Sequence, residues 1–119
     1  MAGNIKGINI EIGGSTTKLN SALKNVDSTA RDLNKRLKDI DRSLKFNPGN
    51  AELIAQKQRD LAQAVDNTSE KLKILKQSQE QARQALEAGE LGQEKYDALT
   101  REILKTENQL ERYKSQLDQ

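Results

Sequence analysis

The stretch Phe46-Asn47-Pro48-Gly49-Asn50 (FNPGN) separates two long helical patterns in this sequence. Pro48 has no backbone N–H and disfavours helical geometry at the residue before it, while Gly49 tolerates a left-handed turn. Asn50 belongs to the residue types that cap helix N-termini best. The stretch therefore predicts a helix that ends at residue 46, a turn over 47–50 and a second helix that begins at 51.

Apolar residues before this turn recur at alternating steps of four and three residues. This is the heptad spacing of a helix with one apolar seam, and it predicts a helix over residues 15–46 with Ser15 as its N-cap. The seam consists of Leu19, Leu23, Val26, Ala30, Leu33, Leu37, Ile40 and Leu44.

Two further seams with the same spacing follow the Pro48 turn. The second predicts a helix over 51–88, and it consists of Ile54, Gln58, Leu61, Val65, Thr68, Leu72, Leu75, Gln79, Ala82 and Leu86. Gly89 and Gly92 predict a turn over 89–92, in which Leu91 is placed to pack on the first turn of the next helix. The third seam predicts a helix over 93–119, and it consists of Tyr96, Leu99, Ile103, Thr106, Leu110, Tyr113 and Leu117.

Short turns make consecutive helices antiparallel. Folding at Pro48 places Leu37 beside Leu61 and Val26 beside Leu72, and folding at Gly89 places Leu72 beside Leu110. The sequence thus predicts a mainly α fold, an antiparallel helical coiled-coil bundle of three long helices. The same heptad seams could pack on each other within one chain or between chains, and the sequence does not decide between these two arrangements.

Polar residues also occupy seam positions in the second and third helices. Buried polar groups in coiled coils fix register or oligomeric state. The alternative interpretation is that these seam positions are exposed to solvent. The residues concerned are Gln58, Thr68, Gln79 and Thr106.

A short β-strand is predicted before the first helix, within residues 1–14. Ile8, Ile10 and Ile12 alternate with polar residues at the period of a strand with one apolar face, and Gly13 and Gly14 end the pattern. An unpaired strand is open to pairing with another chain, so we expect these three isoleucines to form an interaction strand. The alternatives are that the segment folds back onto the first helix or has no structure in the isolated chain.

Composition argues against several function classes. Apolar residues make up 34% and charged residues 32%, which is typical of long solvated helices and not of a thick globular core. The chain has no His and no Cys, so the usual general base, thiolate nucleophile and zinc ligands are missing. We therefore predict that it is not an enzyme and that it needs no metal or cofactor.

Charge and hydropathy give two further expectations. The net charge of +2 is too balanced to indicate specific nucleic-acid binding, and acidic residues interrupt the basic ones. No stretch reaches the roughly 18 apolar residues of a membrane span, so no membrane contact is expected in this segment.

The sequence also resembles a known family. The stretches IKGINIEIGGSTTKL (Ile5–Leu19), LKFNPGN (Leu44–Asn50) and GELGQEKY (Gly89–Tyr96) together are similar to the N-terminal region of tail tape measure proteins of bacteriophages and prophages. The resemblance covers essentially the whole chain. The first two stretches carry it, because the third is a general helix-hairpin pattern.

The resemblance implies a structural protein of the phage tail whose extended helical length sets tail length during assembly. It implies other copies of the chain, tail tube, tail-tip and tail-chaperone proteins as partners. It places the protein in the host cytoplasm during assembly and then in the virion tail. Because this segment folds back at Pro48 and Gly89, we expect a terminal docking or oligomerisation segment, with the ruler downstream in the parent protein.

Two other interpretations of the helical pattern remain open. A WXG100-like secreted helical hairpin has a similar size, although this chain has no Trp-x-Gly turn. A spectrin-like three-helix interaction module fits the length and the seams, although the predicted strand and the absence of Trp count against it.

Overall fold

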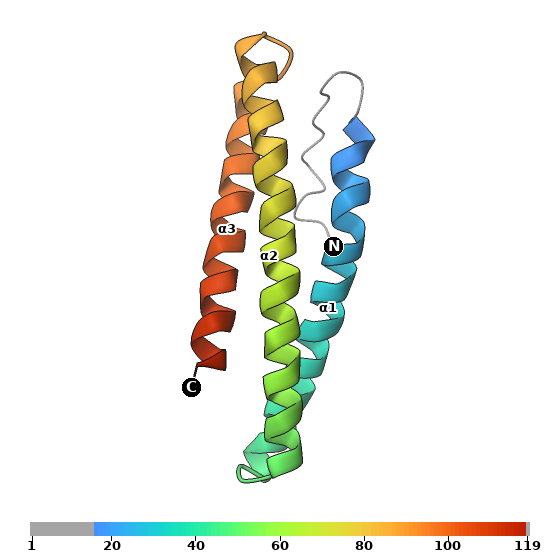
Figure 1. Cartoon of the computed structure of the whole chain (residues 1–119), viewed down its shortest axis with the longest axis vertical. Helices are drawn as coiled ribbons and strands as arrows, with labels where there is room; N and C mark the ends of the chain where they lie inside the picture. Colours follow the sequence, from blue (N-terminus) through green and yellow to red (C-terminus); the bar gives the residue numbers. More distant parts are fainter. Residues whose placement is uncertain (1–15, 119) are drawn as a thin grey trace.

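A computed structural model describes the chain over residues 16–118, with side chains from residue 21 onward. This part folds into three helices, α1 (Thr16–Phe46), α2 (Ala51–Glu87) and α3 (Gln93–Leu117), as Figure 1 shows. The mainly α prediction is confirmed. The predicted strand with Ile8, Ile10 and Ile12, and the predicted cap Ser15, lie outside the described residues.

The turn between α1 and α2 begins the second helix through a side-chain cap. Asn50 has extended backbone geometry, and its side-chain oxygen accepts a hydrogen bond from the backbone N–H of Leu53 at 3.0 Å. The backbone N–H of Asn50 donates in turn to the carbonyl of Asn47 at 3.1 Å, which closes the turn around Pro48. Both bonds satisfy groups that a helix end leaves without an intrahelical partner.

The turn between α2 and α3 depends on the left-handed conformation of Gly89, whose φ is 78°. The N–H of Gly89 donates to the carbonyl of Leu86 at 3.1 Å, and the N–H of Glu90 donates to the carbonyl of Ala85 at 2.8 Å. This pair of bonds is the Schellman motif, which ends a helix and reverses the chain. Leu91 follows directly and is buried in the core, so the turn is also held by apolar packing.

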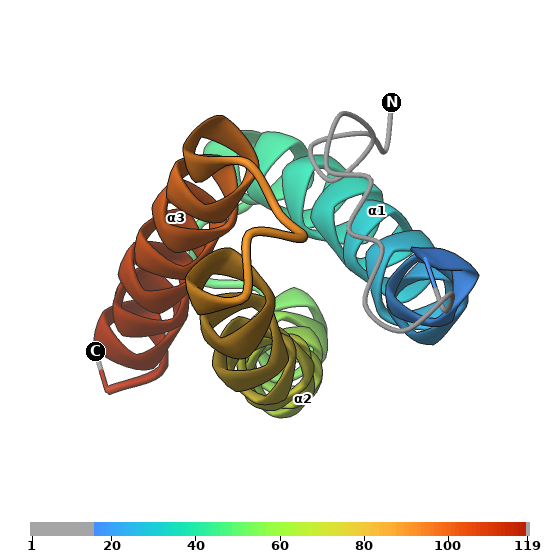
Figure 2. The ribbon, with the colours of Figure 1, turned by 90° about the horizontal axis from the view of Figure 1, so that it is seen from above.

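The three helices form an elongated body measuring 57 × 22 × 18 Å. The backbone of α2 lies close to the backbones of both other helices, whereas no Cα atom of α1 lies within 8 Å of a Cα atom of α3 within the described residues. The end-on view in Figure 2 shows the three helices arranged as a triangle. The middle helix is therefore the common support of the bundle.

Side chains from all three helices form two separate apolar clusters. The first, near the Gly89 turn, consists of Leu23, Val26, Leu75, Ala82, Ala85, Leu91, Leu99 and Ile103. The second, toward the other end, consists of Leu33, Leu37, Leu61, Ala64 and Tyr113. Both clusters include residues of α1, α2 and α3, so the described part of the chain closes a three-helix core by itself.

Cross-helix ion pairs give the register of α1 against α2. Arg36 donates two hydrogen bonds to the carboxylate of Asp60, at 3.1 and 3.2 Å, and Lys57 pairs with Asp41 at 2.8 Å. The same clusters bring Leu37 together with Leu61 and Val26 together with Leu72. These contacts match the antiparallel register of the two helices that is expected from a turn at Pro48.

One end of the bundle has only two helices. Ile54 begins a row of residues spaced seven apart along α2, and the later members Leu61, Thr68, Leu75 and Ala82 are all buried. Ile54 itself is 43% exposed, and it lies beyond the part of α2 that residues Gln93–Leu117 of α3 cover. Phe46, next to the turn, is 82% exposed. The end with the Pro48 turn thus presents apolar side chains that a third helix covers elsewhere in the bundle.

Candidate functional site: a polar layer and a groove between two helices

The predicted seam residues differ in burial along the bundle. Most lie in the core, namely Leu23, Val26, Leu33, Leu37, Ile40, Leu61, Leu75, Leu99, Ile103, Leu110 and Tyr113. Others are half-buried, namely Leu44, Val65, Leu72, Leu86, Tyr96 and Leu117. Ile54 is exposed, as are the turn residues Pro48, Gly49, Gly89 and Gly92. The side chain of Leu19 is outside the described part.

A layer of charged side chains separates the two apolar clusters, and it joins all three helices. The ammonium group of Lys71 on α2 lies 3.1 Å from a carboxylate oxygen of Asp27 on α1 and 3.4 Å from one of Glu102 on α3. The side chains of Lys71 and Asp27 are 14% exposed and that of Glu102 is 5% exposed. A carboxylate or ammonium group is costly to bury without an opposite charge. Lys71 is therefore the group that allows both carboxylates to stay inside the bundle.

Hydroxyl and amide groups complete this polar layer. Thr68 and Thr106 are buried, and the hydroxyl of Thr106 donates to the carbonyl of Glu102 at 2.8 Å. Asn67 donates from its side-chain amide to the carbonyl of Val26 at 2.8 Å, which ties α2 to the backbone of α1. Among the described residues, every buried side-chain nitrogen or oxygen has a hydrogen-bonding partner. A fully satisfied network of this kind favours one register over its alternatives.

The polar layer opens into a groove between α1 and α3, with α2 as its floor. The cavity has a volume of about 380 Å³. Its walls and floor consist of Ala30, Arg31 and Asn34 from α1, of Asn67, Thr68 and Lys71 from α2, and of Glu102, Lys105, Thr106, Gln109, Arg112 and Tyr113 from α3. We call this cavity the α1–α3 groove.

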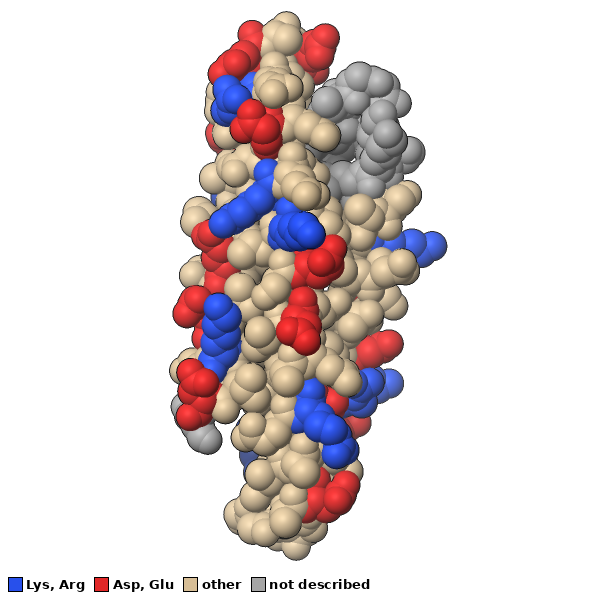
Figure 3. Space-filling view, in the orientation of Figure 1, with Lys and Arg blue, Asp and Glu red and all other residues tan. Residues whose placement is uncertain are grey.

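Basic side chains dominate the open part of this groove. Arg31 on the α1 wall and Lys105 and Arg112 on the α3 wall are exposed, whereas the acidic lining residue Glu102 is buried against Lys71. By contrast, the face of the molecule in Figure 3 shows basic and acidic side chains interspersed along the helices. The groove is thus a local concentration of positive charge on a protein whose net charge is only +2.

A second cross-helix contact lies nearer to the Pro48 turn. Arg36 and Asp60 line a shallower cavity together with Gln56 and Arg59. Because Asp60 accepts hydrogen bonds from the guanidinium group and adds its negative charge, it raises the pKa of Arg36 above the ordinary value. Planar guanidinium and carboxylate groups match in this two-bond geometry, so the pair fixes the orientation of α1 on α2.

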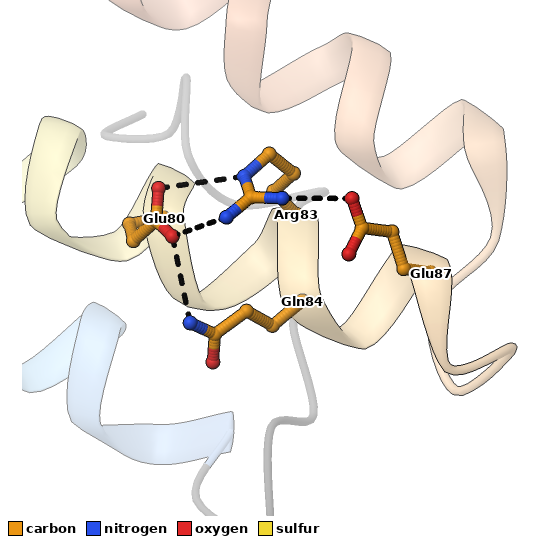
Figure 4. Close-up of polar contacts among 4 residues, drawn as sticks. All are labelled: Glu80, Arg83, Gln84 and Glu87. Atoms are coloured by element: carbon orange, nitrogen blue, oxygen red, sulfur yellow. Dashed lines mark hydrogen bonds and ion pairs between the residues drawn. The ribbon is translucent and has the colours of Figure 1, made fainter.

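Exposed charges on α2 pair along the helix itself, as Figure 4 shows. Arg83 donates to Glu80 one turn earlier and to Glu87 one turn later, and Gln84 also donates to Glu80. The hydrogen bonds from Arg83, and then its positive charge, lower the pKa of Glu80 below the ordinary value. This network supports the helix locally and brings no other helix into contact.

The described residues contain neither a metal-binding cluster nor a membrane-spanning helix. No group of three or more acidic side chains between residues 16 and 118 is placed to hold a metal ion. Over the same range, none of the three helices combines the length and apolar character of a membrane span.

The sequence pattern indicated only part of the polar layer. Thr68 and Thr106 are seam residues, so their polarity marked an exception to the apolar seams. Asp27, Lys71 and Glu102 each stand beside a seam residue, and nothing in the spacing distinguishes them from solvated surface charges. Their convergence depends on three helices that are far apart in the sequence.

A known protein shares the resemblance to tape measure proteins that the three sequence stretches indicate. The chain is 31% identical over 110 residues, or 92% of its length, to a protein named "Probable tape measure protein" from Lactococcus phage SK1. No protein-family model matches the chain, and no solved structure matches it. The chain spans only 11% of the length of the phage protein. The resemblance to tape measure proteins is therefore confirmed, and this chain is a relative of one region of such a protein.

Proposed function

We propose that this chain is the N-terminal docking and oligomerisation segment of a tape measure protein that sets phage tail length. Its similarity to a phage tape measure protein supports a structural role in the phage tail. The finer role rests on the way the helices fold back on each other. The proposal includes assembly in the host cytoplasm followed by a place in the virion tail.

The single observation that carries the docking role is the short overall length. Helices of 31, 37 and 25 residues joined end to end would span about 140 Å, at about 1.5 Å per residue. The longest extent of the bundle is only 57 Å. A segment that folds back in this way converts sequence into length poorly, and it is better suited to binding than to measuring.

Two features of the chain provide surfaces for such binding. The end with the Pro48 turn exposes Phe46 and Ile54. The predicted strand adds Ile8, Ile10 and Ile12, which would extend a partner's sheet by strand addition. The partners we propose are other copies of the chain and tail tube, tail-tip or tail-chaperone proteins.

A spectrin-like three-helix interaction module is the second candidate. The observation that favours it is the core, because residues of all three helices meet within one chain. A two-helix hairpin of the WXG100 type has no place for α3, which supplies Leu99 and Ile103 to that core. A spectrin-like module would stay a compact monomer, whereas the docking role needs self-association or a tail partner.

Light scattering coupled to size-exclusion chromatography tests oligomerisation on the full chain. We expect an oligomer that Ile10→Asp weakens, because the substitution places a charge on the apolar face of the predicted strand. The matched control is Asn9→Asp, which adds the same charge to the opposite face. A monomer that Ile10→Asp leaves unchanged would contradict self-association through the strand.

Tail length tests the docking role against a ruler role. An in-frame deletion of residues 51–92 in the encoding phage removes α2 with its turn. A ruler shortens in proportion to the residues lost, at about 1.5 Å for each helical residue. We expect instead that tails fail to assemble, because the bundle loses its central helix. Normal assembly of tails shorter by about 60 Å would overturn the docking role.

A further inference from the structure

We propose that the α1–α3 groove is a binding site for an acidic polypeptide segment. This inference goes beyond the proposed tail role, because the groove and its charges belong to the folded single chain and do not depend on that role. The chemistry it requires of the ligand is a run of Asp or Glu side chains on a peptide backbone. Its evidence comes from the walls of the groove, its floor and the spacing of the helices.

The walls supply the positive charge. Arg31 on α1 faces the same cavity as Lys105 and Arg112 on α3, and all three are exposed. Within residues 21–118, no carboxylate forms an ion pair with any of these three side chains, although Arg112 donates to the amide oxygen of Gln109 at 2.9 Å. Guanidinium and ammonium groups so placed form charge-assisted hydrogen bonds with carboxylates.

The floor of the groove contributes no free positive charge to the binding of this ligand. Lys71 is already paired with both Asp27 and Glu102, so its positive charge is not available to an outside anion, and one cation with two carboxylates leaves this layer with a net negative charge. Thr68 and Thr106 beside it are buried. An anionic ligand is therefore bound by the basic side chains of the two walls and not by the floor.

The spacing of the helices gives a reason for a bridging ligand. The backbones of α1 and α3 both lie close to that of α2, but no Cα atoms of α1 and α3 lie within 8 Å of each other within the described residues. Basic side chains on the two walls repel each other across the groove. A segment with several carboxylates offsets this repulsion and connects the walls, in the position that a fourth helix occupies in a four-helix bundle.

A polypeptide fits the groove better than a nucleic acid does. Asn34 and Gln109 line the walls with side-chain amides, each of which both donates and accepts, as a peptide backbone requires. Recognition of single-stranded nucleic acid relies on exposed aromatic faces for base stacking. Tyr113 is the only aromatic residue of the lining, and it is 8% exposed. Its ring is thus packed in the core and offers no stacking face.

Fluorescence anisotropy on the isolated full chain tests the proposal. The probe is a fluorescein-labelled 20-residue peptide with Glu at every third or fourth position among Ala residues, and the reference is the same peptide with Gln in place of Glu. We expect saturable binding of the Glu peptide only, weakened by added salt because screening reduces charge attraction. Equal binding of the Gln peptide, or no binding of the Glu peptide, would overturn the proposal.

Charge reversal on the walls locates the site. Lys105→Glu combined with Arg112→Glu should raise the dissociation constant of the Glu peptide by roughly tenfold or more, since two charge-assisted contacts are lost. Arg31→Glu, on the opposite wall, should weaken binding of the Glu peptide as well. The matched control combines Lys73→Glu with Lys114→Glu, which changes the net charge equally at two exposed positions outside the groove lining. An equal loss in this control would show binding by net charge alone and would refute the site.

Two further measurements complete the experiment. Circular dichroism of each variant should show unchanged helicity, because Arg31, Lys105 and Arg112 are all exposed. A labelled single-stranded oligodeoxynucleotide of 20 nucleotides serves as the competing class of ligand. If it binds more tightly than the Glu peptide and the same wall variants weaken it, the groove recognises nucleic-acid phosphates and the polypeptide assignment is wrong.

Discussion

Replacing Lys71 by Met is expected to destabilise the bundle far more than the loss of an ordinary surface lysine. Lys71 is the cation between Asp27 and Glu102, at 3.1 and 3.4 Å, and these side chains are between 5% and 14% exposed. Removing one partner of a buried ion pair costs about 3–5 kcal/mol, because the remaining charge stays buried without compensation. Because Asp27 is partly exposed, the cost of leaving its charge unpaired is smaller, so we expect a loss of about 2–4 kcal/mol in the free energy of unfolding.

Lys76→Met is the matched control on the same helix. Lys76 also pairs with a carboxylate of α3, Glu107, at 3.5 Å, but the two side chains are 55% and 41% exposed. Exposed pairs contribute about 0–1 kcal/mol. Urea unfolding followed by circular dichroism at 222 nm measures both variants against the original chain, and equal m-values would show that the compactness of the two end states is unchanged.

A triple variant separates the loss of attraction from the burial of unpaired charge. Combining Lys71→Met with Asp27→Asn and Glu102→Gln removes all three charges and keeps the side-chain sizes similar. We expect it to recover most of the stability, to within about 1 kcal/mol of the original chain. If Lys71→Met costs no more than Lys76→Met, or if the triple variant is as unstable as the single one, the buried ion layer does not hold the bundle as described.

Three further predictions concern packing, the turn and pH. Leu75→Ala should cost about 3–5 kcal/mol, because Leu75 is fully buried, whereas Ile54→Ala on the same heptad row should cost about 1 kcal/mol; equal losses in urea unfolding would show that Ile54 is covered in solution. Gly89→Ala should cost about 1–2 kcal/mol, since φ is 78° there, and an unchanged melting temperature would contradict the left-handed turn. Arg83 lowers the pKa of Glu80, so the pair adds stability that is fully present above about pH 4.5 and lost as the pH falls through the lowered pKa. Glu80→Gln should therefore lower the urea midpoint at pH 7 but not at pH 2; a difference that persists at pH 2 would contradict this assignment.

The sequence by itself determined the helices and their order, because the signals involved are local. A proline and a glycine act within their own turn, and heptad spacing describes one face of one helix. The pairing of Leu37 with Leu61 also follows from the sequence, since a short turn leaves few registers for an antiparallel pair. Resemblance to a known family added the proposed tail role, which no physical pattern in the residues contains.

Only the tertiary structure decided where charge is buried and where the bundle is open. Asp27, Lys71 and Glu102 look like surface residues in the sequence, and they converge because three helix faces meet at one level. The α1–α3 groove exists because the backbones of both outer helices lie close to α2 and farther from each other within the described residues. Likewise, Ile54 has the same heptad position as Leu61 and Leu75, but it is exposed where they are buried. Each of these outcomes depends on contacts between distant segments, which the period of a single helix does not encode.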